Sequence, residues 1–340
     1  MINAFIAGVA GETLSPAEAS FFRSAAPAGL ILFARNCVDH DQIRRLVGDV
    51  RDAVGGDALL VLIDQEGGRV QRLRPPLGRA LPAAQAYATL YAEDAELAQQ
   101  AAFHAARLVA DDLRALGINT DCAPVLDLPV PGAHDIIGDR AYGCEVTQVA
   151  ILARSVAEGF MAGGVLPVIK HIPGHGRATA DSHLELPVVT ESHAVLSATD
   201  FAPFKALRDM PAAMTAHVVF TAIDADHPAS TSRRVTRDII RDEIGFDGLL
   251  MSDDLSMKAL SGTFAERTRA VLKAGSDLAL HCNGVLAEME EVAGAVSALS
   301  GEALRRFHAA LAVLGRRDWR SEQADGTLNQ CSLPFTFSGA

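Results

Sequence analysis

The segment Lys170–His183, with the sequence KHIPGHGRATADSH, carries three histidines, one lysine and one aspartate. These side chains could bind a metal ion, transfer protons or form a covalent adduct. The metal ligands would be His171, His175, Asp181 and His183. The first two have the spacing of a helical zinc pair, but a proline and a glycine between them disfavour a helix. The sequence therefore predicts no metal site.

Asp181 and His183 are the residues of this segment that could transfer a proton. An aspartate two residues before a histidine can orient the imidazole and favour its protonated form, and such a pair exchanges protons near neutral pH. An Asx turn followed by a solvated histidine would use the same residues. The tripeptide by itself leaves both interpretations open.

Lys170 offers a different chemistry. A lysine at the end of a strand can form a Schiff base with a carbonyl substrate if burial lowers its pKa. Nearby carboxylates would instead keep the amine charged, and a charged lysine donates hydrogen bonds to a substrate hydroxyl. A lyase that uses Lys170 is therefore an alternative, and it is less favoured than hydrogen bonding by this residue.

The composition predicts a globular protein with a large core, because 49% of the 340 residues are hydrophobic and only 21% are charged. A net charge of −12 without a basic cluster argues against a nucleic-acid partner. No run approaches the roughly 18 apolar residues of a membrane span. The N-terminal segment lacks the positive region of a signal peptide. We therefore expect a soluble protein without a membrane partner.

The cysteine pattern points to a reducing compartment. There are five cysteines, at positions 37, 122, 144, 282 and 331. Their odd number, wide spacing and lack of a CxxC pair argue against a disulfide framework and a structural zinc site. We expect a cytoplasmic protein and a monomer.

Short apolar runs alternate with stretches of helical periodicity along the chain. The eight runs span residues 2–9, 29–36, 58–68, 118–128, 165–174, 212–220, 248–254 and 277–284. Helices are expected between them, for example over 41–53, 95–116, 147–162, 197–208, 233–244 and 264–274. This alternation predicts the α/β class and a single (β/α)8 TIM barrel over residues 1–318, followed by a tail over 319–340.

A doubly wound sheet is the alternative fold. It would require a glycine-rich phosphate-binding loop after an early strand, and DQEGGRVQR matches neither GxGxxG nor the P-loop.

Charged or imidazole side chains lie at the ends of six of the eight runs. They include Asp64, Glu66, Asp121, Asp127, Lys170, His171, His217, Asp253, Asp254 and His281. A barrel carries its active site where the strands end, so these side chains should gather on one face. We interpret Glu66 and His175 as supports for neighbouring loops. The roles of Asp121 and His217 stay open between lining the pocket and bracing it.

Several segments together resemble the family 3 glycoside hydrolases, specifically the bacterial β-N-acetylglucosaminidases of peptidoglycan recycling. The matching segments are GLILFARN, IDQEGGRVQRL, IGDRAYG, KHIPGHG with DSHLELP, and MSDDLSM. The resemblance extends over roughly residues 3–315. It implies a barrel fold, no metal or organic cofactor, and a small carbohydrate substrate. That substrate would be a muropeptide fragment that ends in 1,6-anhydro-N-acetylmuramic acid.

The resemblance also implies roles for individual residues. Asp253 corresponds to the nucleophile, His183 to the general acid/base and Asp181 to its partner. Sugar-binding positions correspond to Asp64, Arg72, Arg140, Lys170 and His171. A retaining glycosidase needs a carboxylate on one face of the anomeric carbon and a proton donor on the leaving-group side. A histidine, with an ordinary pKa of about 6.5, needs only a small shift to donate that proton.

Two points stay open at this stage. Strand pleating allows only one of Asp253 and Asp254 to face the pocket, and the resemblance selects Asp253. A neutral imidazole in place of the usual second carboxylate does not repel an anionic acceptor, so phosphate could replace water. A phosphorylase is therefore an alternative on the same site.

Overall fold

The computed structural model describes residues 1–56, 58–178, 182 and 185–315. The predicted acid/base residues Asp181 and His183 lie outside the described residues. So do the predicted domain boundary at residue 318 and the tail over 319–340.

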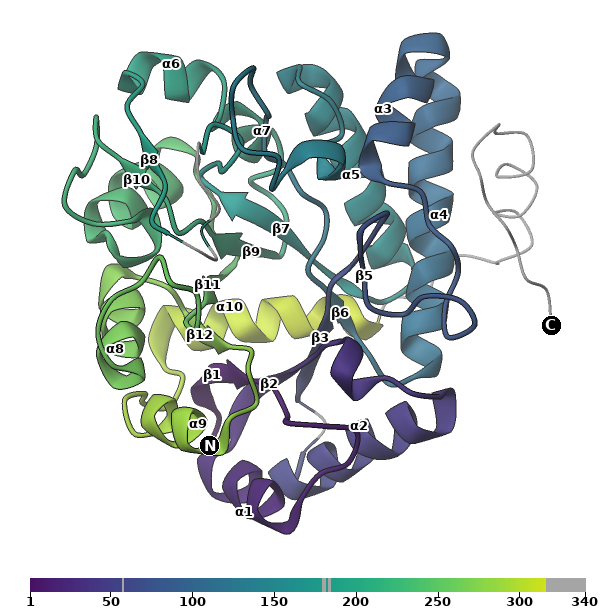
Figure 1. The fold of residues 1–340 in the computed structure, drawn as a ribbon, viewed down its shortest axis with the longest axis vertical. Coiled ribbons are helices and arrows are strands. Elements are labelled where there is room, and N and C mark those ends of the chain that lie inside the picture. Colours follow the sequence, from purple (N-terminus) through teal and green to yellow (C-terminus); the bar gives the residue numbers. More distant parts are fainter. Residues whose placement is uncertain (57, 179–181, 183–184, 316–340) are drawn as a thin grey trace.

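Eight strands close into a barrel in the order β1-β12-β11-β9-β7-β6-β3-β2 (Figure 1). They are β1 Asn3–Ala7, β2 Pro27–Leu32, β3 Leu60–Ile63, β6 Thr120–Asp121, β7 Leu166–Ile172, β9 Ala212–Thr215, β11 Leu249–Asp254 and β12 Leu278–His281. Every neighbouring pair is parallel. Each strand overlaps one of the eight predicted runs, so the prediction of a (β/α)8 barrel is confirmed.

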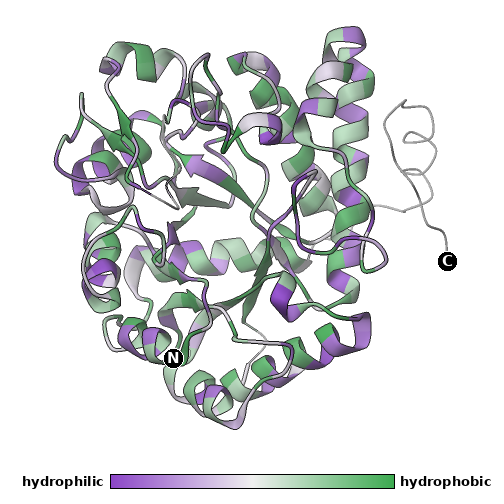
Figure 2. Ribbon diagram, viewed as in Figure 1, coloured by the Kyte–Doolittle hydropathy of each residue, from purple (hydrophilic) through white to green (hydrophobic). Residues whose placement is uncertain are grey.

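Helices surround the barrel, and Figure 2 shows hydrophobic residues along the strands that they cover (Figure 1). They are α1 Pro16–Ala25, α2 His40–Val54, α3 Ala84–Glu93, α4 Ala95–Ala115, α5 Val146–Ala162, α6 His193–Ala198, α7 Ala202–Ala206, α8 Phe264–Ala274, α9 Leu286–Ala293 and α10 Gly301–Leu311. Short 3-10 helices are η1 Ala34–Asn36, η2 Gly138–Arg140, η3 Ala229–Thr231 and η5 Ala312–Gly315, and η4 Val235–Glu243 is a π-helix. Two small sheets lie outside the barrel: β4 Gln65–Gly67 with β5 Val70–Gln71, and β8 Val188–Val189 with β10 Val219–Phe220.

The strands are largely apolar because both of their faces are buried. Ile31 pairs with Leu62 across β2 and β3, and both side chains point into the barrel. Leu30 and Val61, one position earlier, point outward and pack in the core beneath the helices. Side chains of α10, among them Phe307, join the interior cluster, and the segment before α10 pairs with the start of β1. The amino end of the barrel is therefore covered, and the site must use the other end.

The predicted helix over 197–208 was wrong in its extent. The structure has two short helices, α6 and α7, separated by a turn at residues 199–201. Pro203 in the first turn of α7 explains the break, because proline within a longer helix would lose a backbone hydrogen bond and clash with the preceding turn.

No helix among the described residues is long and apolar enough to cross a lipid bilayer.

Candidate active site

A pocket of about 380 Å³ opens at the carboxyl ends of the barrel strands. Its lining includes Asp64, Arg72, Arg140, Lys170, His171 and Asp253, which are six of the eight predicted site residues. The other two, Asp181 and His183, lie outside the described residues, but Ser182 between them lines the same pocket and is 2% exposed. Strands that are far apart in sequence thus bring these side chains to one cavity, as a TIM barrel does at this face.

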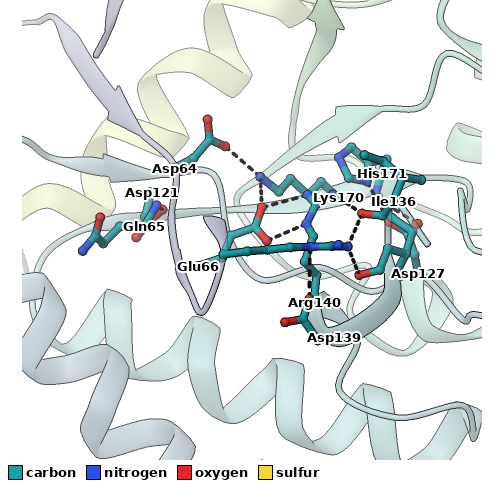
Figure 3. Close-up of polar contacts among 12 residues, drawn as sticks. Asp64, Gln65, Glu66, Asp121, Asp127, Ile136, Asp139, Arg140, Lys170 and His171 are labelled. Atoms are coloured by element: carbon teal, nitrogen blue, oxygen red, sulfur yellow. Dashed lines mark hydrogen bonds and ion pairs between the residues drawn. The ribbon is translucent and has the colours of Figure 1, made fainter. Parts of the chain in front are cut away.

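Lys170, near the end of β7, is the centre of an ion-pair network (Figure 3). Its Nζ lies 2.8 Å from Oδ1 of Asp64 and 2.6 Å from Oε1 of Glu66. The second carboxylate oxygen of Asp64 accepts a hydrogen bond from Arg72 Nη2 at 2.9 Å. The Lys170 side chain is 3% exposed, so its charge depends on these carboxylates rather than on water.

Glu66 also binds Arg140 through two parallel hydrogen bonds. Arg140 Nε donates to Oε2 at 2.8 Å and Nη2 donates to Oε1 at 2.9 Å (Figure 3). This two-pronged geometry orients the guanidinium plane as well as neutralising it. Arg140 Nη1 donates to the Ile136 carbonyl at 3.0 Å, which further fixes the side chain. Sequence reasoning assigned Glu66 to loop support and missed this contact with two predicted sugar-binding residues.

These ion pairs determine the protonation states of Glu66, Asp64 and Lys170. Burial would raise the pKa of Glu66, but Lys170 and Arg140 outweigh it and lower the pKa to about 2. Burial also acts against charge on Asp64, yet Lys170 and Arg72 hold its pKa well below the usual range. For Lys170, burial lowers the pKa and the two carboxylates raise it by more. All three groups are therefore charged at neutral pH.

The hairpin β4–β5 carries Glu66 to the pocket. Gly67 has φ +102°, and a Cβ there would lie 2.3 Å from the Pro82 carbonyl oxygen, so the close approach requires glycine. The Gln65 side chain accepts hydrogen bonds from the backbone N–H groups of Arg72 and Leu73, both at 3.0 Å. The DQEGG segment therefore positions Asp64 and Glu66 directly and Arg72 through its backbone.

Asp121 on β6 holds this hairpin in place through a hydrogen bond to its backbone. Its Oδ1 accepts the Gln65 backbone N–H at 3.0 Å, and it does not line the pocket. Burial raises the pKa of Asp121 to about 8, so the carboxyl is mostly neutral at pH 7. The sequence left open whether Asp121 lines the pocket or braces it, and the structure shows that it braces the hairpin.

His171 is held by Asp127, a fully buried carboxylate that follows β6. Oδ2 of Asp127 lies 2.7 Å from His171 Nδ1, and Oδ1 accepts the backbone N–H groups of His171 and His175 at 3.3 and 2.7 Å. Because the carboxylate only accepts, Nδ1 of His171 carries a proton. Asp127 was noted in the sequence only as a polar residue near a strand end, and its partners 44 and 48 positions away are visible only in the fold.

His175 links this cluster to Ser182. Its Nε2 lies 3.1 Å from the Ser182 hydroxyl oxygen. Burial, assisted by the neighbouring His171, lowers the pKa of His175 to about 4, so the ring is neutral at pH 7. His175 therefore supports a loop, as expected, although it also lines the pocket.

Asp254, beside the predicted nucleophile, has a structural task. Its Oδ1 accepts the backbone N–H groups of Ser256 and Cys282 at 3.0 and 3.1 Å, and its Oδ2 accepts the Ser256 hydroxyl. The Asp254 backbone N–H donates to Oδ1 of Asp253 at 2.8 Å. Asp253 and Asp254 both line the pocket, so the expectation that only one of them would face it was wrong. The register of β11 against β12 shifts between Met251 and Asp254, which breaks the alternation of the strand there. With Asp254 occupied in this way, Asp253 stays the predicted nucleophile.

His217 braces the same strand end. Its Nε2 donates to the Asp254 carbonyl oxygen at 3.0 Å, and its Nδ1 accepts from the Ser230 hydroxyl at 2.6 Å. Burial lowers the pKa of His217, which favours this neutral form. His217 is not among the residues that line the pocket.

The pocket is lined by paired charges that can exchange hydrogen bonds with hydroxyl groups. Each of its four lysine and arginine side chains, Arg69, Arg72, Arg140 and Lys170, is paired with a carboxylate. Paired charges present donors and acceptors together, as sugar hydroxyls require. Apolar side chains such as Phe33 and Met257 complete the wall. The described residues contain no group of three or more His, Cys, Asp or Glu side chains that could hold a metal ion.

This chain is similar to known glycoside hydrolases over most of its length. The family model of the glycosyl hydrolase family 3 N terminal domain matches residues 12–313. A β-hexosaminidase of Bordetella avium is 39% identical over 93% of this chain and 90% of its own length. One from Actinobacillus succinogenes is 42% identical over 80% and 79%.

A solved structure of NagZ from Neisseria gonorrhoeae superposes with a TM-score of 0.86 at 32% identity, and covers 97% of this chain and 98% of that one. The same protein in complex with N-trifluoroacetyl-D-glucosamine gives a TM-score of 0.84 over 96% and 93%. The family match and the relatives cover nearly all of the described barrel and its site. The chain therefore belongs to glycosyl hydrolase family 3 and, within that family, to the bacterial β-N-acetylhexosaminidases.

Proposed function

We propose that this enzyme removes terminal β-linked N-acetylglucosamine by a two-step retaining mechanism. Asp253 would attack the anomeric carbon, and His183, oriented by Asp181, would protonate the leaving oxygen and later activate water. The observation that carries the proposal is the pocket itself. It brings the Asp253 carboxylate together with paired hydrogen-bonding groups and with Ser182, the residue between the proposed acid/base pair.

In the first step the Asp253 carboxylate forms a bond to the anomeric carbon while the glycosidic bond breaks. The leaving oxygen takes the proton of His183. In the second step a water gives its proton to His183, and its oxygen replaces Asp253. The Asp254–His217 contacts fix the end of β11, so the nucleophile is held in place before substrate arrives.

Substrate hydroxyls would be bound by Asp64, Arg72, Arg140, Lys170 and His171. Nδ1 of His171 is occupied by Asp127, which leaves Nε2 for the substrate. Because Lys170 and Arg140 are already oriented by Glu66, binding requires little rearrangement of charged groups.

The Lys170 lyase is disfavoured by the same network. Two carboxylates within 2.8 Å keep the Lys170 amine charged, and a charged amine is not a nucleophile. Phosphorolysis on the Asp253 site stays an alternative that product analysis decides.

The proposed natural substrate is a muropeptide that carries N-acetylglucosamine on 1,6-anhydro-N-acetylmuramic acid. We also propose a cytoplasmic monomer. The four described cysteines, Cys37, Cys122, Cys144 and Cys282, are free, which supports a reducing compartment. Cell fractionation and light scattering would test the location and the monomeric state.

The test is release of 4-nitrophenol from its β-N-acetylglucosaminide, with and without phosphate, by the wild type, Asp253→Asn and His183→Ala. Asp41→Asn, at an exposed carboxylate on α2, is the matched control. Release of free N-acetylglucosamine by the wild type and the control, with almost no turnover by Asp253→Asn, would support the hydrolase. Sugar 1-phosphate as the main product would establish a phosphorylase, and no turnover of this substrate or of a muropeptide would refute the proposal.

A further inference from the structure

Asp127 is a fully buried carboxylate that does not line the pocket, yet it contacts two residues that do. Its Oδ2 accepts the Nδ1–H of His171, and its Oδ1 accepts the backbone N–H groups of His171 and His175 (Figure 3). Burial acts against charge on Asp127, but the two histidines hold its pKa below the usual range. The carboxylate is therefore ionised at neutral pH and can only accept hydrogen bonds.

Two histidines at the strand ends are held in opposite tautomers. For His171 the carboxylate lies at Nδ1, so that nitrogen carries the proton of the neutral ring. For His217 the Asp254 carbonyl oxygen lies at Nε2 and the Ser230 hydroxyl at Nδ1, so the proton is on Nε2. Of the two rings, His171 lines the pocket. A neutral His171 therefore offers the pocket a nitrogen without a proton.

The pocket can use such an acceptor. Both oxygens of Asp64 are engaged by cations, and so are both oxygens of Glu66. A sugar hydroxyl that accepts a hydrogen bond from one of these cations still has its own proton to donate. Nε2 of His171 makes no hydrogen bond within the part of the chain that the structure describes, so it is available to that proton.

We propose that Asp127 is a positioning residue that makes His171 a hydrogen-bond acceptor for a substrate hydroxyl. Asp127 holds the ring proton on Nδ1, and the bare Nε2 accepts from the sugar. Three N–H groups already satisfy the carboxylate, so its charge requires no second proton on the ring. This inference rests on the proposed glycosidase function and adds to it how one binding residue selects for a hydroxyl group.

Asp127→Asn inverts this arrangement with almost no change of shape. An amide has one acceptor oxygen, and the backbone N–H groups of His171 and His175 require it. The amide NH2 then faces Nδ1, so the ring proton moves to Nε2 and His171 becomes a donor. Asp277→Asn is the matched control. Asp277 is also buried and accepts a backbone N–H, that of Leu250, but it does not line the pocket.

The first test is nitrogen NMR of isotope-labelled histidines at neutral pH, with His171→Gln to assign the signals. The wild type should show His171 protonated on Nδ1 alone and His217 protonated on Nε2 alone. In Asp127→Asn the His171 pattern should invert and the His217 pattern should stay. A wild-type His171 that carries a proton on Nε2 would overturn the proposal, and so would an unchanged tautomer in Asp127→Asn. If that variant does not fold, the wild-type spectrum decides.

The second test measures the selection for a hydroxyl through kcat/KM. 4-Nitrophenyl β-N-acetylglucosaminide is compared with analogues in which fluorine replaces one sugar hydroxyl at a time, because carbon-bound fluorine has no proton to donate. At one position the preference for hydroxyl over fluorine should fall about threefold to tenfold in Asp127→Asn, the value of one hydrogen bond. The preference should stay unchanged in Asp277→Asn.

The same preferences in the wild type and Asp127→Asn, or an equal fall in Asp277→Asn, would overturn the proposal. If the wild type turns over none of these sugars, the proposed glycosidase function fails. The NMR result then still decides whether Asp127 fixes the tautomer of His171, so the two failures are distinguishable.

Discussion

The pocket and a second groove, of about 710 Å³ between α8 and the segment that enters η4, both contain lysine and arginine side chains, but they use them in opposite ways. In the pocket, Lys170 is buried, Arg140 is mostly buried, and each is paired with Glu66. In the groove, Arg233 and Arg234 are exposed and form no ion pair among the described residues. A buried cation must be paired to be charged, whereas an exposed one is solvated and can exchange water for a ligand. The first arrangement suits a neutral sugar, whereas the second leaves its cations in water.

The comparison is sharpest at Asp253, the proposed nucleophile. We expect Asp253→Asn to lower kcat on the 4-nitrophenyl substrate about 10³-fold or more, because the amide cannot form the covalent intermediate. Asp226→Asn, which removes an exposed carboxylate of the groove, should change kcat less than about twofold. Steady-state kinetics on both variants, with circular dichroism as a check of folding, measure this difference. Comparable losses in the two variants would contradict the assignment of Asp253.

The two lysines provide the next contrast. Lys170→Met leaves Asp64 and Glu66 without a shared cation, and we expect it to lower the free energy of unfolding by about 3 to 5 kcal/mol. Lys273→Met in the groove should change it by less than about 0.5 kcal/mol. Urea unfolding of both variants tests this, and a stable Lys170→Met protein would show that the network is not the buried structure described above.

The low pKa of Glu66 predicts a loss of stability in acid. Its pKa is about 2 in the folded protein, against an ordinary value of 4.5 for a solvated glutamate. The contribution of Glu66 to the free energy of unfolding is therefore fully present above pH 4.5 and is lost as the pH falls toward 2. Between about pH 6 and pH 3 the wild type should lose about 2 kcal/mol from this group, and Glu66→Gln should lack that part. Glu266→Gln, at an exposed cap in the groove, is the control. An equal loss of stability in acid by the wild type and Glu66→Gln would refute this explanation.

Salt gives the smallest expected effect. Raising the ionic strength from about 0.05 to about 0.5 M should change kcat/KM for the neutral 4-nitrophenyl substrate less than about twofold, because buried ion pairs are poorly screened. A larger change would mean that the pocket's charges are exposed to solvent during turnover.

Much of this site could be predicted because it depends on local pattern. Each strand is largely apolar, and a polar residue at its end marks the face where catalysis occurs. Lys170, His171 and the pair Asp253 and Asp254 were found in this way, whereas the choice of Asp253 as the nucleophile came from the family resemblance. The pairing of Arg140 with Glu66, 74 positions apart, could not be found, because neither residue has a local signal for its partner. The prediction of one helix over 197–208 rested on apolar periodicity. It was wrong because Pro203 lies in the first turn of a separate helix, α7.

The sequence by itself determined the barrel and its chemical inventory. Eight apolar runs must be buried on both faces, and a closed parallel sheet ringed by helices does this. Only the tertiary structure decided which charges are paired. It set Lys170 between two carboxylates, gave Asp254 a structural role beside Asp253, and left Arg233 and Arg234 exposed. The reason is physical, because whether a charge needs a partner depends on its burial, and burial is a property of the folded chain.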